Sequence, residues 1–254
     1  MRRTGMVVVS AVLLASAAQA ASCSSTGGKF EAWKKEFAAE AKANGIKAKG
    51  LAALASSSYS TGTIKADRGQ HSFKLSLDQF MAKRGAAAIV SRGKKLKAAN
   101  AALFAKIEKK YGVPAGPLIA IWGMETGFGA VTGSQPTISA VATLAYDCRR
   151  SEYFTEHLNA ALKLVDRGVL SSSTRGAMHG EVGQTQFLPK NILIYGTGGD
   201  LNNKASALAS TANFLSGESW KKGGPYSAGQ FASWNAATVY QKALAIMATK
   251  IDAK

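Results

Sequence analysis

Apolar residues recur at intervals of three and four positions along most of this chain, and that spacing predicts helices. Phe30, Trp33, Phe37 and Ala41 form one such face, in a helix that should end near Gly45. Alternating patterns typical of strands are scarce. We therefore expect an all-α or α-dominated fold, α+β at most, with no more than a short hairpin in the loops. The same spacing predicts a helix that begins near Pro117 and further helices at 103–111, 136–145, 152–167, 205–215 and 235–251.

Polar residues and glycines fill the segment 59–71, which we expect to be a long loop. This loop would join an N-terminal helical extension, residues 21–70, to the body of the protein, residues 71–254. A chain of 254 residues is long enough to bury a full core as one large domain with small appendages.

Residues 1–20 have the composition of a secretory signal peptide. Arg2 and Arg3 precede an apolar run at 6–18, and Ala18-Gln19-Ala20 matches a small-x-small cleavage site. The run is too short to anchor the protein in a membrane. We therefore expect the mature chain, residues 21–254, to be exported.

Two cysteines, Cys23 and Cys148, remain after this cleavage. In an oxidising compartment such a pair favours one disulfide. The alternative is a lipid attached to Cys23, and membrane association would follow only in that case. The residues just before Cys23 lack the leucine usually found three positions before a lipidated cysteine, which favours the disulfide.

Charge narrows the choice of partners. The chain carries 32 Lys and Arg against 15 Asp and Glu, a net charge of +17, which favours a polyanionic partner or environment. Export argues against nucleic acid, and the lysines are not interleaved with stacking aromatic residues. The anionic bacterial wall fits better. His71, His157 and His179 lack the spacing of metal ligands, and no phosphate loop or dinucleotide motif occurs. We expect no metal and no cofactor.

Glu125 is the first candidate for chemistry. It follows a run of apolar residues from Leu118 to Met124 that only Gly123 interrupts, and Gly127 and Gly129 come directly after it. Burial disfavours an ionised carboxylate and raises its pKa, so the group can hold a proton near neutral pH. That property suits a general acid. The alternative is a glutamate at a helix end with its carboxylate in water.

The stretch 175–189 is the second candidate. Glycines surround Glu181, Gln184 and Gln186 there, so the backbone can approach a ligand closely. Amide side chains both donate and accept hydrogen bonds, which suits the N-acetyl and hydroxyl groups of a sugar. The alternative is a polar, glycine-rich turn before a helix, with no ligand.

Taken together, the blocks Gly-Met-Glu-Thr-Gly-Phe-Gly (123–129) and Gly-Glu-Val-Gly-Gln-Thr-Gln-Phe-Leu-Pro (180–189) resemble the signature blocks of the lytic murein transglycosylase B family. Residues 111–114, 142–150, 234–235 and 239–241 match as well, so the resemblance covers essentially the whole mature chain. It implies a lysozyme-like helical fold with a cleft. It also implies cleavage of the peptidoglycan glycan between N-acetylmuramic acid and N-acetylglucosamine.

By position, Glu125 matches the family's catalytic glutamate, and Gln186 matches a glutamine that lines the cleft and contacts substrate. We expect substrate contacts also from Gln184, Glu181, Thr126, Phe128, Tyr146 and Asn235. Two departures stand out. Ala177 and Met178 occupy places where many members have serine and a large aromatic residue. Residues 196–200 replace a longer aspartate-rich calcium loop of some members, so we expect no calcium site.

The resemblance implies an unusual mechanism with one carboxylate. Glu125 would protonate the glycosidic oxygen and then, as a base, activate the C6 hydroxyl of the sugar, which closes a 1,6-anhydro ring. The alternatives are a lysozyme-type hydrolase that uses Glu125 and Glu181, and a peptidoglycan-binding protein without activity. We expect a monomer that acts on glycan strands in the periplasm, associated with the outer membrane or secreted.

Overall fold

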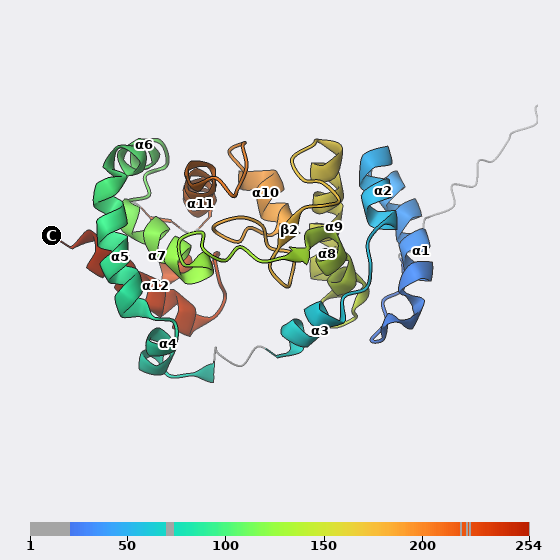
Figure 1. Ribbon diagram of the computed structural model, residues 1–254, viewed down its shortest axis with the longest axis horizontal. Coiled ribbons are helices and arrows are strands. Elements are labelled where there is room, and N and C mark those ends of the chain that lie inside the picture. Colours follow the sequence, from blue (N-terminus) through green and yellow to red (C-terminus); the bar gives the residue numbers. More distant parts are fainter. Residues whose placement is uncertain (1–20, 70–73, 219, 222, 224, 254) are drawn as a thin grey trace, which may run out of the picture.

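A computed structural model describes residues 21–69, 74–218, 220–221, 223 and 225–253. The proposed signal peptide and His71 lie outside the described residues. The fold is dominated by helices, as predicted (Figure 1). The elements are η1 Gly27–Lys29, α1 Phe30–Ala43, α2 Ala48–Ala55, α3 Thr61–Arg68, α4 Leu77–Lys83, α5 Ala86–Ala99, α6 Ala101–Tyr111, α7 Ala115–Thr126, β1 Gln135–Pro136, α8 Thr137–Tyr146, α9 Ser151–Asp166, β2 Arg175–Gly176, α10 Pro189–Tyr195, α11 Lys204–Gly217, η3 Ala228–Phe231 and α12 Thr238–Asp252.

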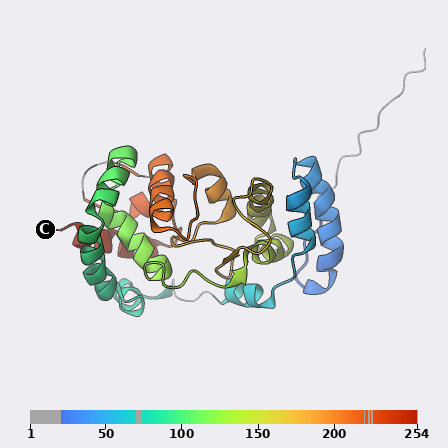
Figure 2. The same cartoon turned by 45° about the horizontal axis from the view of Figure 1, so that its top comes forward.

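The molecule is elongated, with a group of helices at each end and α10 and α11 between the two groups (Figures 1 and 2). At one end α2 packs against α9, and α1 and α3 pack against α8. At the other end α12 packs against α7, α5 and α4. After α3 the chain passes to this second end, returns through β1 to α8 and α9, and crosses once more on its way to α11 and α12 (Figure 1). Both ends therefore depend on segments far apart in the sequence.

Helix α7 is the buried centre of the second end. Nearly all its residues are inaccessible to solvent because α5 and α12 cover it. Close packing requires Gly116, where a Cβ would lie 2.5 Å from the carbonyl oxygen of Ala248 in α12. The Asp252 carboxylate accepts hydrogen bonds from the Gly116 N–H, at 3.0 and 3.1 Å, and so satisfies a donor at the start of α7. The end of α12 thus fixes the beginning of α7.

A disulfide and an aromatic cluster attach the N-terminal segment to the first end. Cys23 is bonded to Cys148, the pairing that the sequence favours. The Ser24 N–H donates to the carbonyl of Tyr146 at 2.9 Å, and the rings of Phe30 and Trp33 pack against the Tyr146 ring. The N-terminal helices share one hydrophobic core with the rest of the described chain. The boundary predicted near residue 70 stays a prediction.

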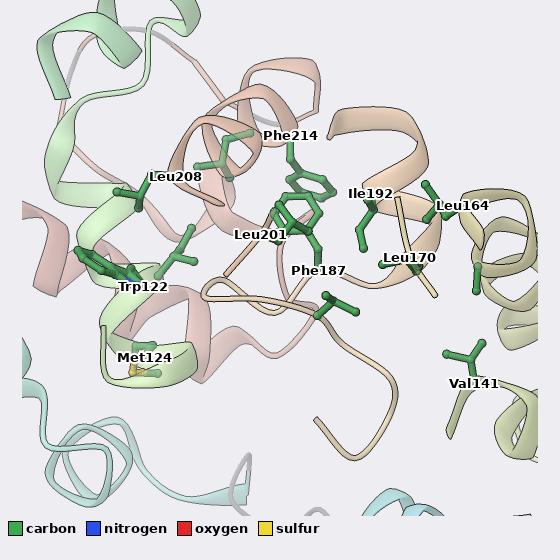
Figure 3. Packing of buried hydrophobic residues seen from close by; sticks show 14 of the residues in the cluster. Trp122, Met124, Val141, Leu164, Leu170, Phe187, Ile192, Leu201, Leu208 and Phe214 are labelled. Carbon is green, nitrogen blue, oxygen red and sulfur yellow. The ribbon is translucent and has the colours of Figure 1, made fainter. Parts of the chain in front are cut away.

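Between the two ends, apolar side chains form a continuous cluster (Figure 3). It runs from Trp122 and Met124 on α7, past Phe187 and Phe214, to Leu164 on α9. The Phe187 and Phe214 rings meet edge to face at 6.1 Å between centroids. No helix among the described residues is long and apolar enough to cross a membrane.

Two local predictions need correction. The segment 59–71, predicted as a loop, contains α3 over Thr61–Arg68. The residues that α3 buries are polar, Thr63 and Asp67, so its sequence shows no apolar face. The strands are also not a hairpin, because β1 pairs antiparallel with β2 across about 40 residues of intervening chain, Gln135 opposite Gly176. Predictions for α1, α6, α8 and α9 agree with the structure to within two residues at each end, and α12 starts three residues later than predicted.

Candidate active site

A cavity of about 620 Å³ lies between the two ends of the molecule. One wall consists of Glu125 from α7 and residues 233–237, which connect η3 to α12. The opposite wall consists of Arg150, Tyr153 and Phe154 from the start of α9, together with His179 and Glu181. Phe187 and Phe214, from the apolar cluster, line it as well. The cavity therefore brings together segments that the sequence separates by more than 100 residues.

Glu125 lies in the last turn of α7 and accepts two hydrogen bonds on one oxygen. The hydroxyl of Tyr240 donates to Oε1 at 2.5 Å, and Nε1 of Trp234 donates to the same atom at 3.1 Å. Tyr240 is fully buried and its ring packs edge to face on Phe80 of α4. Since both donors bind Oε1, the other carboxyl oxygen is the one suited to carry the proton.

The surroundings of Glu125 favour its protonated form. Burial is the largest cause that raises the pKa of Glu125, and the charge of Glu181 raises it further. The hydrogen bonds from Tyr240 and Trp234 lower the pKa but do not outweigh burial. The last turn of a helix also disfavours negative charge. Burial and the charge of Glu125 raise the pKa of Tyr240 well above its usual value, so Tyr240 stays a donor.

Glu181 lies across the cavity and is held by His179 through both oxygens. The backbone N–H of His179 donates to Oε2 at 3.0 Å, and Nδ1 of its ring lies 3.3 Å from Oε1. Burial raises the pKa of Glu181, but the hydrogen bonds and charge of His179 outweigh burial and lower the pKa below its usual value. The pKa values of the two carboxyl groups are therefore shifted in opposite directions, that of Glu125 upward and that of Glu181 downward.

A buried carboxylate from α3 supports this wall from behind. Asp67 receives hydrogen bonds from Arg149 and Arg150, and Nε2 of His179 lies 3.8 Å from its Oδ1. Burial raises the pKa of Asp67, and the two arginines lower it by more, so it is ionised. Arg68 forms a second ion pair with Asp147 at 2.5 Å. These ion pairs dock the end of α3, while Ile64 of the same helix packs against the hydrophobic core.

Gln186 shapes the loop between the walls. Its backbone has a φ of 56°, a conformation that residues with side chains seldom adopt. Gln186 lies within a tight turn that two backbone hydrogen bonds between Val182 and Phe187 close. The side-chain nitrogen donates to the carbonyls of Gly183 and Thr132 at 2.8 and 3.2 Å. With its donors engaged, the amide presents its oxygen as the acceptor available at the cavity wall.

The structure thus places four predicted residues on the cavity: Glu125, Glu181, Gln186 and Asn235. Asn235 accepts a hydrogen bond from the Ala237 N–H at 2.9 Å, which shapes the turn before α12. Arg150 and Trp234 also line the cavity, and Tyr240 lies behind Glu125. All three lie in blocks that match the family, but we assigned them no role from the sequence. Tyr153 was missed altogether. It is 49% exposed, and such a ring beside a cleft is a surface on which a sugar can stack.

The other four predicted substrate contacts are not among the residues that line this cavity. The structure shows contacts within the protein for each of them, and their contact with substrate stays a prediction. Gln184 accepts from Trp122 Nε1 at 2.8 Å and donates to the carbonyl of Asn202. Thr126 is buried and donates to the Gln184 carbonyl at 2.6 Å, which joins α7 to the loop.

Phe128 packs edge to face on Trp122, with Arg92 over its ring. Tyr146 is buried and donates to the Thr26 carbonyl at 2.8 Å. Sequence blocks alone do not separate residues that line a cleft from residues that hold its walls together.

A family model described as the transglycosylase SLT domain matches residues 29–243. The chain belongs to the transglycosylase SLT domain family. The match includes every cavity residue named above, from both walls. Among curated relatives of this family, membrane-bound lytic murein transglycosylase B of Escherichia coli (strain K12) is 32% identical over 121 residues, which cover 44% of this chain and 34% of that protein.

Solved structures agree with this assignment. SltB3 from Pseudomonas aeruginosa, in complex with NAG-anhNAM-pentapeptide, superposes with a TM-score of 0.71 at 33% identity, covering 79% of this chain and 56% of that chain. The Escherichia coli lytic transglycosylase Slt35 in complex with bulgecin A has a TM-score of 0.74 at 18% identity, covering 86% and 92%, and supports the fold alone. This SLT-domain chain spans about a third of the curated relative's length and about half of SltB3.

Proposed function

We propose that the protein is a peptidoglycan lytic transglycosylase that cleaves the β-1,4 bond between N-acetylmuramic acid and N-acetylglucosamine. One observation carries this proposal. Glu125 lies at a cavity wall, where burial raises its pKa and Tyr240 and Trp234 orient its carboxyl group. Family membership and the complexes of SltB3 with peptidoglycan fragments support the choice of substrate.

The proposed reaction uses Glu125 twice. Its proton passes to the glycosidic oxygen as the bond from that oxygen to C1 of the muramic acid breaks, and the 2-acetamido group stabilises the cationic C1. The Glu125 carboxylate then takes the proton of the C6 hydroxyl while O6 bonds to C1. The 1,6-anhydro ring closes, Glu125 is protonated again, and no water is consumed. A raised pKa suits a group that acts as acid and then as base.

The other cavity residues have roles that fit this reaction. The oxygen of the Gln186 amide is an acceptor for a hydroxyl or N-acetyl N–H of the glycan. Tyr153 offers a ring face for sugar stacking, and Asn235 offers amide groups beside Glu125. Tyr240 and Trp234 fix the Glu125 carboxyl in one orientation. Substrate contacts of Gln184, Thr126, Phe128 and Tyr146 stay a prediction, since these residues do not line the cavity.

A lysozyme-type hydrolase is the second candidate, because Glu181 lines the same cavity as Glu125. Two carboxylates that flank a glycosidic bond can activate water instead of the sugar's own hydroxyl. The lowered pKa of Glu181 makes it a weak base, which favours the transglycosylase. A binding protein without activity is the third candidate and would leave the glycan intact.

Mass spectrometry of muropeptides released from purified sacculi distinguishes these candidates. We expect products that end in 1,6-anhydro-N-acetylmuramic acid, lighter by one water than hydrolysed chains. Reducing ends would support the hydrolase and contradict the proposal. Intact glycan after prolonged incubation with folded protein would leave only the binding function.

We further propose that the protein acts in the periplasm as a monomer, after removal of residues 1–20. The signal-peptide pattern supports export. The disulfide engages the sulfur of Cys23, which leaves no thiol there for a lipid. The mass of the protein purified from its cell envelope tests whether residues 1–20 are removed and whether Cys23 carries a lipid, because a diacylglycerol on Cys23 would add its own mass.

A further inference from the structure

A chain of charged groups connects the cavity to the N-terminal segment. Glu181 lines the cavity, His179 contacts both of its carboxylate oxygens, and Asp67 lies 3.8 Å beyond the far nitrogen of the His179 ring. His179 is largely buried, with a side chain 13% exposed, and Asp67 is more buried still at 1%. The imidazole therefore lies between the carboxylate of Glu181, which faces the cavity, and the carboxylate of Asp67, which is shielded from water.

Asp67 is itself fixed by residues between α8 and α9. Arg149 donates through Nε to the Asp67 carboxylate and through a terminal nitrogen to the Asp67 carbonyl, the latter at 3.0 Å. Arg150 donates to the other oxygen, and its guanidinium also lies over the Phe154 ring. A carboxylate with this many charge-assisted contacts cannot turn away from His179. The end of α3 thereby sets the orientation of a ring in the cavity wall.

We propose that Glu181 acts as a fixed negative charge that stabilises the cationic C1 of the glycan, and that His179 and Asp67 are positioning residues that hold it there. This inference rests on the proposed lytic transglycosylase function. Glu181 neither gives nor receives a proton in this role. The N-terminal segment, through Asp67, becomes part of the catalytic machinery.

The geometry favours a fixed charge over a base. Both oxygens of Glu181 already accept hydrogen bonds from His179, whereas the bonds that Tyr240 and Trp234 donate to Glu125 fall on one oxygen. A base works best when its pKa lies near the operating pH, and that of Glu181 is lowered. A preorganised charge needs no rearrangement as positive charge develops on the substrate, and this makes it effective in stabilising that charge.

The pH behaviour depends on every charged or titratable group that faces Glu181. His179 holds the pKa of Glu181 down. Glu125 lies across the cavity, and Arg150 lines the same wall. On α9, burial raises the pKa of Tyr153, and burial lowers the pKa of His157 to about 4, so both are neutral between pH 5 and 8. The Glu125–Glu181 and His179–Glu181 pairs therefore determine most of the pH dependence in this range.

The first test replaces Glu181→Gln and measures kcat and kcat/KM against pH on purified glycan strands. We expect kcat to fall about 100-fold, as for the loss of one preorganised electrostatic group. The products should still end in 1,6-anhydromuramic acid. Without the charge of Glu181 the pKa of Glu125 falls, so the loss of activity at high pH should begin at a lower pH than in the wild type.

A matched control is Glu156→Gln. Glu156 is an exposed carboxylate on α9, paired with Lys190, and it does not line the cavity. We expect wild-type kcat and an unshifted pH profile. A Glu181→Gln variant that matches this control in both would overturn the inference.

The second test replaces His179→Gln and asks whether His179 positions Glu181. This change keeps the backbone N–H that binds Glu181 and removes the ring. The pKa of Glu181 should then rise, so activity should be lost at a higher pH on the acidic side, with a smaller fall in kcat than for Glu181→Gln. Asp67→Asn should shift the acidic side in the same direction. Asp67→Asn also leaves two arginines without their partner and can impair folding. The result for His179→Gln is therefore the one that tests the positioning role.

The inference and the proposed function fail in different ways. Reducing ends from the wild type would contradict the transglycosylase function itself. Anhydro ends from the wild type, together with an unshifted acidic side in His179→Gln, would overturn the positioning role alone. A rise of KM at constant kcat in Glu181→Gln would also overturn the inference, because it would mean that Glu181 only binds substrate.

Discussion

Glu125 and Glu181 line one cavity, yet their surroundings move their pKa values in opposite directions. Glu125 lies at the end of a buried helix, where two neutral donors bind one oxygen and burial dominates. Glu181 lies in a loop, where a histidine contacts both oxygens and the charges of Asp67 and Arg150 lie close behind. The different elements around the two carboxyl groups are the basis for the roles proposed for them, an acid for Glu125 and a fixed charge for Glu181.

The largest expected effect on activity comes from replacing Glu125, at the end of the buried helix α7. Glu125→Gln removes the transferable proton and keeps the shape of the side chain and its two donors. We expect turnover of sacculi to fall about 1,000-fold or more, within the range for loss of a general acid–base group. Thermal unfolding should remain cooperative, and Glu156→Gln should keep full activity. Retention of more than a few per cent of activity would exclude Glu125 as the acid.

A second prediction tests how far the two cavity walls depend on the disulfide that attaches the N-terminal segment. Replacing Cys23→Ser and Cys148→Ser together opens a loop of 125 residues. We expect the free energy of unfolding to fall by about 3 kcal/mol. The pH at which activity is lost on the basic side should not change, because Glu125 lies on helices at the other end. A shift of that basic side would contradict the separation of the two walls.

Tyr240→Phe should change the pKa of Glu125 in the direction opposite to the change expected for Glu181→Gln. The hydrogen bond from Tyr240 lowers the pKa of Glu125, so its loss should raise that pKa further. The basic side of the pH profile should move to higher pH, opposite to the shift expected for Glu181→Gln. Stability should fall by about 1 kcal/mol for one lost hydrogen bond. Unfolding in urea and the pH profile measure the two effects, and a shift to lower pH would contradict this account.

The smallest predicted effect is on stability against pH. Because folding raises the pKa of Glu125, its contribution to stability is complete below the unfolded pKa and is lost as pH rises through the folded value. A tenfold difference in proton affinity between the folded and unfolded chains corresponds to about 1.4 kcal/mol. Relative to wild type, Glu125→Gln should therefore gain stability as pH increases from 4 to 8. A constant difference in the unfolding free energy over that range would show that the pKa of Glu125 is not raised.

The sequence predicted the Glu125 wall better than the Glu181 wall, for a physical reason. An apolar run with one carboxylate near its end is a local pattern, and it identified α7 and its glutamate. The partners of Glu125 follow it by 109 and 115 residues, and only tertiary packing brings them together. Trp234 and Tyr240 stand in matched blocks, but nothing local to them indicates that they bind a carboxyl group.

Helix α3 was missed because ion pairs dock it. Its buried residues are Thr63 and Asp67, so the hydrophobic pattern that predicts other helices is absent. Helix α5 was also missed, since alanines and lysines dominate its sequence and only Ala86, Ile89 and Gly93 are buried. The role proposed for Asp67 depends on contacts with residues 82 and 83 positions away. The sequence of residues 59–71 alone does not predict those contacts.

Direct titration of the two carboxyl groups tests the central claim. With ¹³C-labelled glutamate, the Cδ resonances of Glu125 and Glu181 can be followed by NMR across the pH range and assigned with Glu125→Gln and Glu181→Gln. We predict that Glu181 titrates below the usual value of about 4.3 for glutamate and Glu125 above it. The reverse order, or two resonances that titrate together near that value, would contradict the division of roles between the two walls.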